Sequence, residues 1–181
     1  MPRHAATPAA DSYQVLAEAY AVNERMNQVL LEHLDPRLWR AKPPEEKGRT
    51  IAAIFAHVHN VRRKWLRLSA PHLKLPRELD RTRCTMRQAK TGLAESARRC
   101  EEMLRAALLS GSIKEFLRDG WARAWPPGAA MVVYMIAHDT HHRGQVSMLA
   151  HLLGAPLPAR VGGEMWNWEK LWRKCGFTHP R

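Results

Sequence analysis

Two histidines spaced by one helical turn, His138 and His142, have the residue type and spacing of a metal-binding pair, and Gln145 follows them. In a helix the two imidazoles lie about 40° apart, so each can direct a ring nitrogen at one divalent ion. Gln145 lies in the next turn, where it can orient a ligand or a water, and it is the catalytic candidate. The alternative is a pair of core histidines that hydrogen-bond to neighbouring helices.

A metal site needs at least a third protein ligand, and His57 and His59 form the other concentrated pair of histidines. Residues two apart point to nearly opposite sides of a helix, so only one of the two can face such a site. Both flank an apolar face centred near Val58 and Trp65. Periodicity therefore leaves the choice between them open.

The side of segment 129–153 that carries His138 and His142 is otherwise apolar. It also includes Met131, Met135, Leu149 and Leu152. The opposite side carries Asp139, Thr140, Arg143 and Ser147. A buried polar group without a partner costs about 1–3 kcal/mol, so the two imidazoles need a ligand or hydrogen-bond partners. We expect Arg143 to anchor a neighbouring helix or subunit, and Gly144 to permit a close approach between helices.

Helix-length segments separated by proline and glycine must position these residues. Apolar periodicity predicts helices over 11–33, 50–68, 85–109 and 129–153. Thr50 is a predicted N-cap, and Gly154 closes the last of the four helices. Thr85 and Gln88 have the spacing of a capping box. A turn of helix over 112–118 and a short amphipathic capping helix over 163–172 complete the chain. Strand signals are almost absent, so the predicted fold class is all-α, a four-helix bundle.

The composition fits one globular domain. The chain has 181 residues, of which 45% are hydrophobic, which is enough to build a core. Residues 1–10 read as a flexible leader and residues 11–181 as a single domain. The longest apolar run covers only 128–137, against about 20 residues for a membrane helix, so we expect no membrane span. The 3 cysteines, without a C-x-x-C pattern, indicate free thiols and a cytoplasmic location.

Two motifs resemble the DinB/YfiT-like family of four-helix-bundle metalloenzymes. The string from His138 to Gln145, H-D-T-H-H-R-G-Q, matches the family's H-x-x-x-H-R-G-Q at every fixed position. The run Phe55-Ala56-His57, with Trp65 eight positions on, matches the family's second helix. The resemblance covers the chain after the leader and implies an up-down-down-up bundle. It also implies a cleft at one end of the bundle with three metal ligands, His57, His138 and His142.

The resemblance implies a function as well. Relatives include thiol-dependent S-transferases and are commonly homodimers, so we expect a homodimeric, metal-dependent transferase or hydrolase acting on a small molecule. A low-molecular-weight thiol is a candidate cofactor. Imidazole ligands suit several divalent metals, of which zinc is the first expectation and nickel the second. Glu18, Glu24 and Glu32 are candidates for a general base, with a solvated helix face as the alternative.

The charge supports a competing interpretation. The chain has 29 Lys and Arg against 17 Asp and Glu, a formal net charge of +12. A positive face over residues 61–90 could contact DNA phosphates, although no helix-turn-helix or zinc-finger motif accompanies it. A solvated surface, or attraction of an anionic substrate, accounts for the same charges. A third interpretation is a catalytically silent helical dimer that binds no metal.

Overall fold

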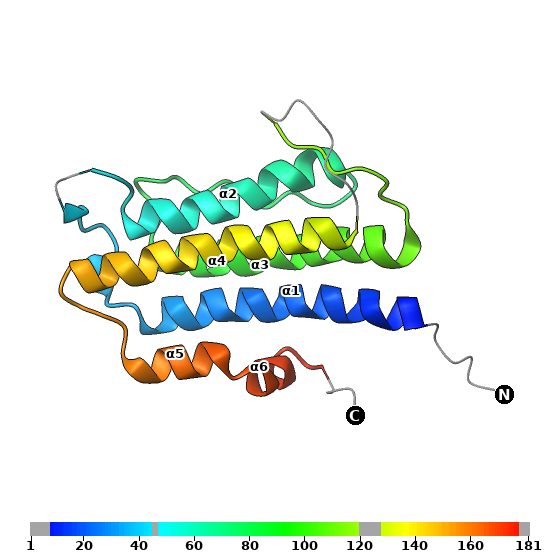
Figure 1. Cartoon of the computed structure of the whole chain (residues 1–181). Coiled ribbons are helices and arrows are strands. Elements are labelled where there is room, and N and C mark those ends of the chain that lie inside the picture. Colours follow the sequence, from blue (N-terminus) through cyan, green and yellow to red (C-terminus); the bar gives the residue numbers. More distant parts are fainter. Residues whose placement is uncertain (1–7, 45–46, 120–127, 178–181) are drawn as a thin grey trace.

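The computed structural model describes residues 8–44, 47–119 and 128–177, and six α-helices and no β-strand lie among these residues. Four long helices form the bundle: α1 (Pro8–His33), α2 (Ile51–Ser69), α3 (Met86–Arg105) and α4 (Ala129–Leu152). α2 and α3 run in one direction, and α1 and α4 run in the other (Figure 1). The all-α class and the up-down-down-up order are therefore confirmed.

Local capping chemistry explains where these helices begin and end. The Thr50 hydroxyl accepts a hydrogen bond from the Ala53 backbone N–H at 3.2 Å, which satisfies a donor in the first turn of α2. Thr85 and Gln88 form the expected capping box at the start of α3. Gly154 has φ +80°, a left-handed conformation that favours glycine after a helix end. These predictions are confirmed.

The beginning of α1 and the end of α3 differ from the helix ranges expected from the sequence. α1 begins at Pro8, so residues 8–10 are helical, and residues 1–7 of the predicted leader lie outside the described part. The α-helical conformation of α3 ends at Arg105 and passes into a π-helical turn, Ala106–Ser110. Gly111, with φ +61°, ends that turn. The predicted helical turn over 112–118 is wrong, because this segment is irregular and its Leu117 backbone N–H donates to the Ser69 hydroxyl of α2 at 2.8 Å.

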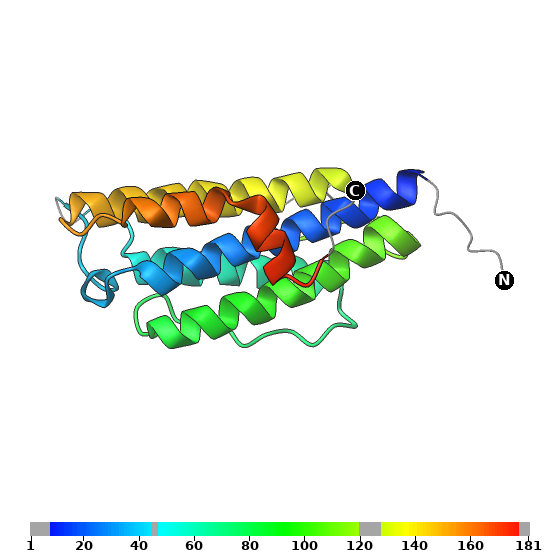
Figure 2. The ribbon, with the colours of Figure 1, turned by 90° about the horizontal axis from the view of Figure 1, so that it is seen from below.

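The C-terminal tail forms two helices instead of the single one expected over 163–172. α5 (Ala159–Trp166) and α6 (Trp168–Lys174) are separated by Asn167, whose side chain accepts from the Lys170 backbone N–H at 3.1 Å and starts α6. Both helices lie against α1 along the side of the bundle (Figure 2). Their apolar residues pack against α1 in one cluster that contains Val22, Met26, Val29, Val161, Leu171 and Trp172.

A polar layer divides the apolar core of the bundle. One apolar cluster contains the stacked rings of Trp39 and Phe55, and the other contains the fully buried Tyr20 and Trp65. On α1 and α4, buried polar residues lie between the stretches that enter the two clusters. The polar layer consists of Asn23, Glu24, Asn27, Gln28, Arg62 and Asp139. Since α1 and α2 each pack against both α3 and α4, this layer connects the helices around it.

Candidate metal centre

Three imidazoles from α2 and α4 converge beside the polar layer. The ring centroid of His57 lies 5.4 Å from that of His138 and 4.8 Å from that of His142. The rings of His138 and His142 are 4.6 Å apart. One potential ligand atom from each residue lies within 4.8 Å of the other two. Three imidazoles gathered in this way are a donor set that suits a divalent metal.

The structure distinguishes His57 from His59, which the sequence could not do. His59 is fully buried on the other flank of α2, with its ring nitrogens 2.9 Å from the Gly92 carbonyl oxygen and 2.8 Å from that of Arg77. A Cβ at Gly92 of α3 would lie 3.4 Å from the His59 ring, which is an ordinary contact distance. His59 is therefore a hydrogen-bonded core histidine, and His57 is the one that joins the cluster.

Burial lowers the pKa of two imidazoles of the cluster, those of His57 and His142. The pKa of His57 is lowered to about 3, first by burial and then by the charge of Arg49. The pKa of His142 is lowered to about 4, again mainly by burial, against the opposing effect of its hydrogen bond to Gln145. Metal ligation requires the neutral imidazole, so two of the three rings are already in the ligating form at neutral pH.

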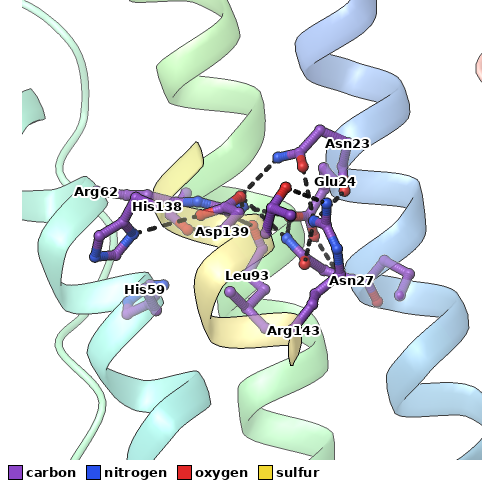
Figure 3. Close-up of polar contacts among 12 residues, drawn as sticks. Asn23, Glu24, Asn27, His59, Arg62, Leu93, His138, Asp139 and Arg143 are labelled. Carbon is purple, nitrogen blue, oxygen red and sulfur yellow. Dashed lines mark hydrogen bonds and ion pairs between the residues drawn. The ribbon is translucent and has the colours of Figure 1, made fainter. Parts of the chain in front are cut away.

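The Nδ1 atoms of the three histidines have different partners. Nδ1–H of His142 donates to Oε1 of Gln145 at 2.7 Å. Nδ1 of His138 faces Oδ1 of Asp139 at 3.7 Å (Figure 3). A hydrogen bond such as that of His142 fixes the orientation of a metal-binding imidazole. Nδ1 of His57 is buried and has no hydrogen-bond partner among the described residues, which is the unsatisfied polar atom that a bound ion would account for.

Asp139 ties this cluster to the polar layer. Its Oδ2 accepts from the guanidinium of Arg62 at 2.5 Å and from the amides of Asn23 at 2.8 Å and Asn27 at 3.1 Å (Figure 3). Arg62 also donates to Glu24 at 2.7 Å. Burial alone would raise the pKa of Asp139, but the charge and hydrogen bond of Arg62 hold it well below its usual range. A buried carboxylate thus stays ionised next to His138.

Several expectations about α4 need correction. Asp139 does lie on the side opposite the histidines, but it faces α1 and is itself buried, whereas Thr140 of the same side is exposed. Leu152, expected on the apolar side, is 58% exposed. A Cβ at Gly144 would meet nothing within 4 Å, so the predicted close helix approach at this glycine is wrong within the chain. Arg143 does anchor a neighbouring helix, because it donates to Oδ1 of Asn23 at 2.7 Å. The histidine cluster lies near the middle of α4 and not at a bundle end.

The three candidate general bases are engaged away from the histidines. Glu24 pairs with Arg62 and accepts from Gln28 at 2.6 Å. Glu18 accepts from Gln14 at 2.6 Å. Glu32 forms ion pairs with Arg25 and Lys90, at 2.9 and 3.1 Å. The contacts of these carboxylates are therefore structural.

The expected positive face over residues 61–90 is interrupted. Arg62 is buried in the polar layer. Arg63 pairs with Glu78 at 3.2 Å, Arg67 pairs with Asp119, and Lys90 pairs with Glu32. Four of the cations assigned to that face thus have partners within the chain, which leaves fewer of them for nucleic-acid phosphates.

Comparison with known proteins agrees with the motifs. The model of the DinB family matches residues 1–170. No curated protein and no solved structure matches the chain.

Of the helices in residues 8–44, 47–119 and 128–177, none has the length and hydropathy needed to span a bilayer. The cysteines are free thiols, as expected from the sequence: Cys84, Cys100 and Cys175.

Proposed function

Since this chain belongs to the DinB family, we propose that it is a metal-dependent enzyme that acts on a small molecule. The convergence of three imidazoles from two helices carries the proposal. His57, His138 and His142 would hold the ion, with zinc as the first choice and nickel as the second. The donor set fits, because it is all imidazole, it is gathered in one place, and one of its buried nitrogens has no other partner.

A bound ion would act as a Lewis acid, lower the pKa of a bound water, or hold a low-molecular-weight thiol as its nucleophilic thiolate. We therefore propose a thiol-dependent S-transfer or a hydrolysis as the reaction type. The residues of the chain supply orientation. Gln145 holds the His142 ring through Nδ1, and Asp139 faces Nδ1 of His138. Gln145 also lines a pocket beside the cluster, which is why we keep it as the catalytic candidate.

Metal analysis of the untagged protein tests this proposal. We expect a stoichiometric ion by inductively coupled plasma mass spectrometry, and its loss in His57→Ala, His138→Ala and His142→Ala. His151→Ala is the matched control, because His151 is an exposed histidine of the same helix. Gln145→Ala should weaken metal binding about 10- to 100-fold, as expected for a residue that orients a ligand. Stoichiometric metal retained in all three histidine variants would refute the proposed ligands.

We also propose a homodimer, supported by the charge distribution on α4. The outward residues of its first two-thirds are exposed and carry no charge: Ala130, Val133, Ala137, Thr140 and Gly144. On a chain of net charge +12, such a face lets two copies meet with little repulsion. Sedimentation should give a dimer that Val133→Glu dissociates, whereas Leu68→Glu, at an exposed leucine of α2, leaves it intact. A monomer at micromolar concentration would refute this proposal.

The location proposed for the enzyme is the cytoplasm, and the three free thiols support it. We expect these thiols to stay reduced when the protein is purified without reductant. Thiol titration of the purified protein tests this.

A further inference from the structure

A cavity of about 760 Å³ opens beside the histidine cluster, between α4 and the loop that precedes α2. Gln145, which holds the His142 ring, lines this cavity. His141, whose ring centroid lies 5.0 Å from that of His142, lines it as well. His57, His138 and His142 do not line the cavity themselves, so it adjoins the candidate metal centre through Gln145 and His141. Its volume is typical of small-molecule sites.

The lining of this cavity has two chemically different parts. Lys47 and Arg49 contribute two cations from the loop side. Arg49 is close enough to the cluster for its charge to lower the pKa of both His57 and His142. The described part of the lining contains no acidic side chain, and Glu45 and Glu46 of the same loop lie outside the described residues.

The other part of the lining is apolar. Met148, Leu149 and Leu152 of α4 line the cavity, facing it together with Ile54 of α2. Met148 and Leu152 are 60% and 58% exposed, so together they present apolar surface to solvent at the edge of the cavity. An apolar group resting on them would remove this surface from water.

We propose that the cavity selects small anionic molecules with an apolar portion, the anionic group lying beside Lys47 and Arg49 and the apolar portion along Met148 and Leu152. This inference names the substrate class of the proposed enzyme and rests on that proposed function. The guanidinium of Arg49 can form paired hydrogen bonds with a carboxylate or a phosphate. The apolar wall supplies affinity that an inorganic anion cannot use.

A set of three probes with one shape and different charge tests the selection: 4-phenylbutanoate, 4-phenylbutanol and 4-phenylbutylamine. Binding is followed by NMR of methyl-labelled methionine in the full-length protein, with Met148→Leu used to assign the Met148 signal. We expect the carboxylate to shift that signal and to bind at least about tenfold more tightly than the alcohol, a difference of about 1.4 kcal/mol. The amine should bind most weakly. A phenylpropyl phosphate ester then distinguishes a phosphate preference from a carboxylate preference.

The double variant Lys47→Gln, Arg49→Gln should abolish the preference for the anion and leave binding of the alcohol unchanged. The matched control, Lys74→Gln with Arg87→Gln, removes the same charge from exposed positions elsewhere and should keep the preference. Equal affinities for the carboxylate and the alcohol, or a preference that survives in the Lys47, Arg49 variant, would overturn the inference.

Zinc titrations, run in parallel, separate this inference from the proposed function. The preference for the anion should be present with and without zinc, because both cations belong to the chain. If zinc does not bind and the preference is present, the selection stands and the metal-dependent function fails. If zinc binds to the three histidines and no preference is found, the metal centre stands and the proposed substrate class fails.

Discussion

The ion pair between Arg62 and Asp139 should contribute strongly to stability, because both groups are almost fully buried. Their side chains are 3% and 2% exposed, and their closest atoms lie 2.5 Å apart. Asp139→Asn keeps the shape of the side chain but removes its charge. A hydrogen bond to a charged group contributes about 1.5–3 kcal/mol, against about 0.5–1.5 kcal/mol for a neutral one. Since Arg62 keeps its second partner, Glu24, we expect a loss of about 2 kcal/mol in the free energy of unfolding.

Larger changes to the Asp139 side chain should lower the free energy of unfolding further. Asp139→Ala removes an acceptor shared by Arg62, Asn23 and Asn27, and we expect it to cost about 3–5 kcal/mol. In a double-mutant cycle with Arg62→Met, the combined loss should fall short of the sum of the single losses by about 1–3 kcal/mol. Urea unfolding followed by circular dichroism measures each value, with an unchanged m-value as the check that the transition is comparable.

An exposed ion pair of the same chain provides the control. Arg98 and Glu102 lie 2.9 Å apart on α3, with side chains 56% and 37% exposed, and Glu102 also pairs with Arg99 at 2.8 Å. Glu102→Gln should therefore cost less than about 1 kcal/mol. If Asp139→Asn costs no more than Glu102→Gln, or if the cycle is additive, the reasoning that burial makes the Arg62 pair strong is refuted.

Three further predictions concern individual residues. In metal-free protein, the free energy of unfolding should fall as the pH drops from about 6.5 to 4, because the unfolded chain takes up protons near pH 6.5, whereas burial lowers the pKa of folded His57 and His142 to about 3 and 4. Urea midpoints measured across this range should show the slope, and His57→Gln should reduce it. His59→Ala should cost about 2–4 kcal/mol, since it removes a fully buried side chain, but metal content by mass spectrometry should be unchanged. In the Val133→Glu background, which we expect to be monomeric, Gly144→Ala should raise the free energy of unfolding by about 0.5–1 kcal/mol, as measured by urea unfolding, because the added methyl meets nothing within 4 Å.

Each of these three predictions would be contradicted by a particular result. Stability that does not change between pH 6.5 and 4 would mean that the folded imidazoles titrate normally. Loss of metal in the His59 variant would place that residue in the centre. A destabilised Gly144→Ala monomer would restore the close approach that the sequence had suggested for this glycine.

The parts of the fold that local chemistry determines were predictable from the sequence. Thr50 and the Thr85–Gln88 pair satisfy backbone donors within three residues of themselves, so their pattern is visible in the chain. The pairing of His138 with His142 is equally local. The choice between His57 and His59 is not, because both flank the same apolar face and only the packing of α2 against α3 and α4 separates them.

The polar layer could not be recognised by periodicity, which treats a charged residue as evidence for a solvent-facing side. Asp139 is buried because its partners lie on other helices: Arg62 on α2, and Asn23 and Asn27 on α1. The signal that was available is the group of polar residues at 23–25 and 27–28, which lies between the apolar stretches 19–22 and 29–31. Groups of that kind at mid-length can be tolerated only where they meet opposite polar partners. The same requirement accounts for the histidine cluster in the middle of α4, since His138 adjoins Asp139 and the cluster lies beside the polar layer.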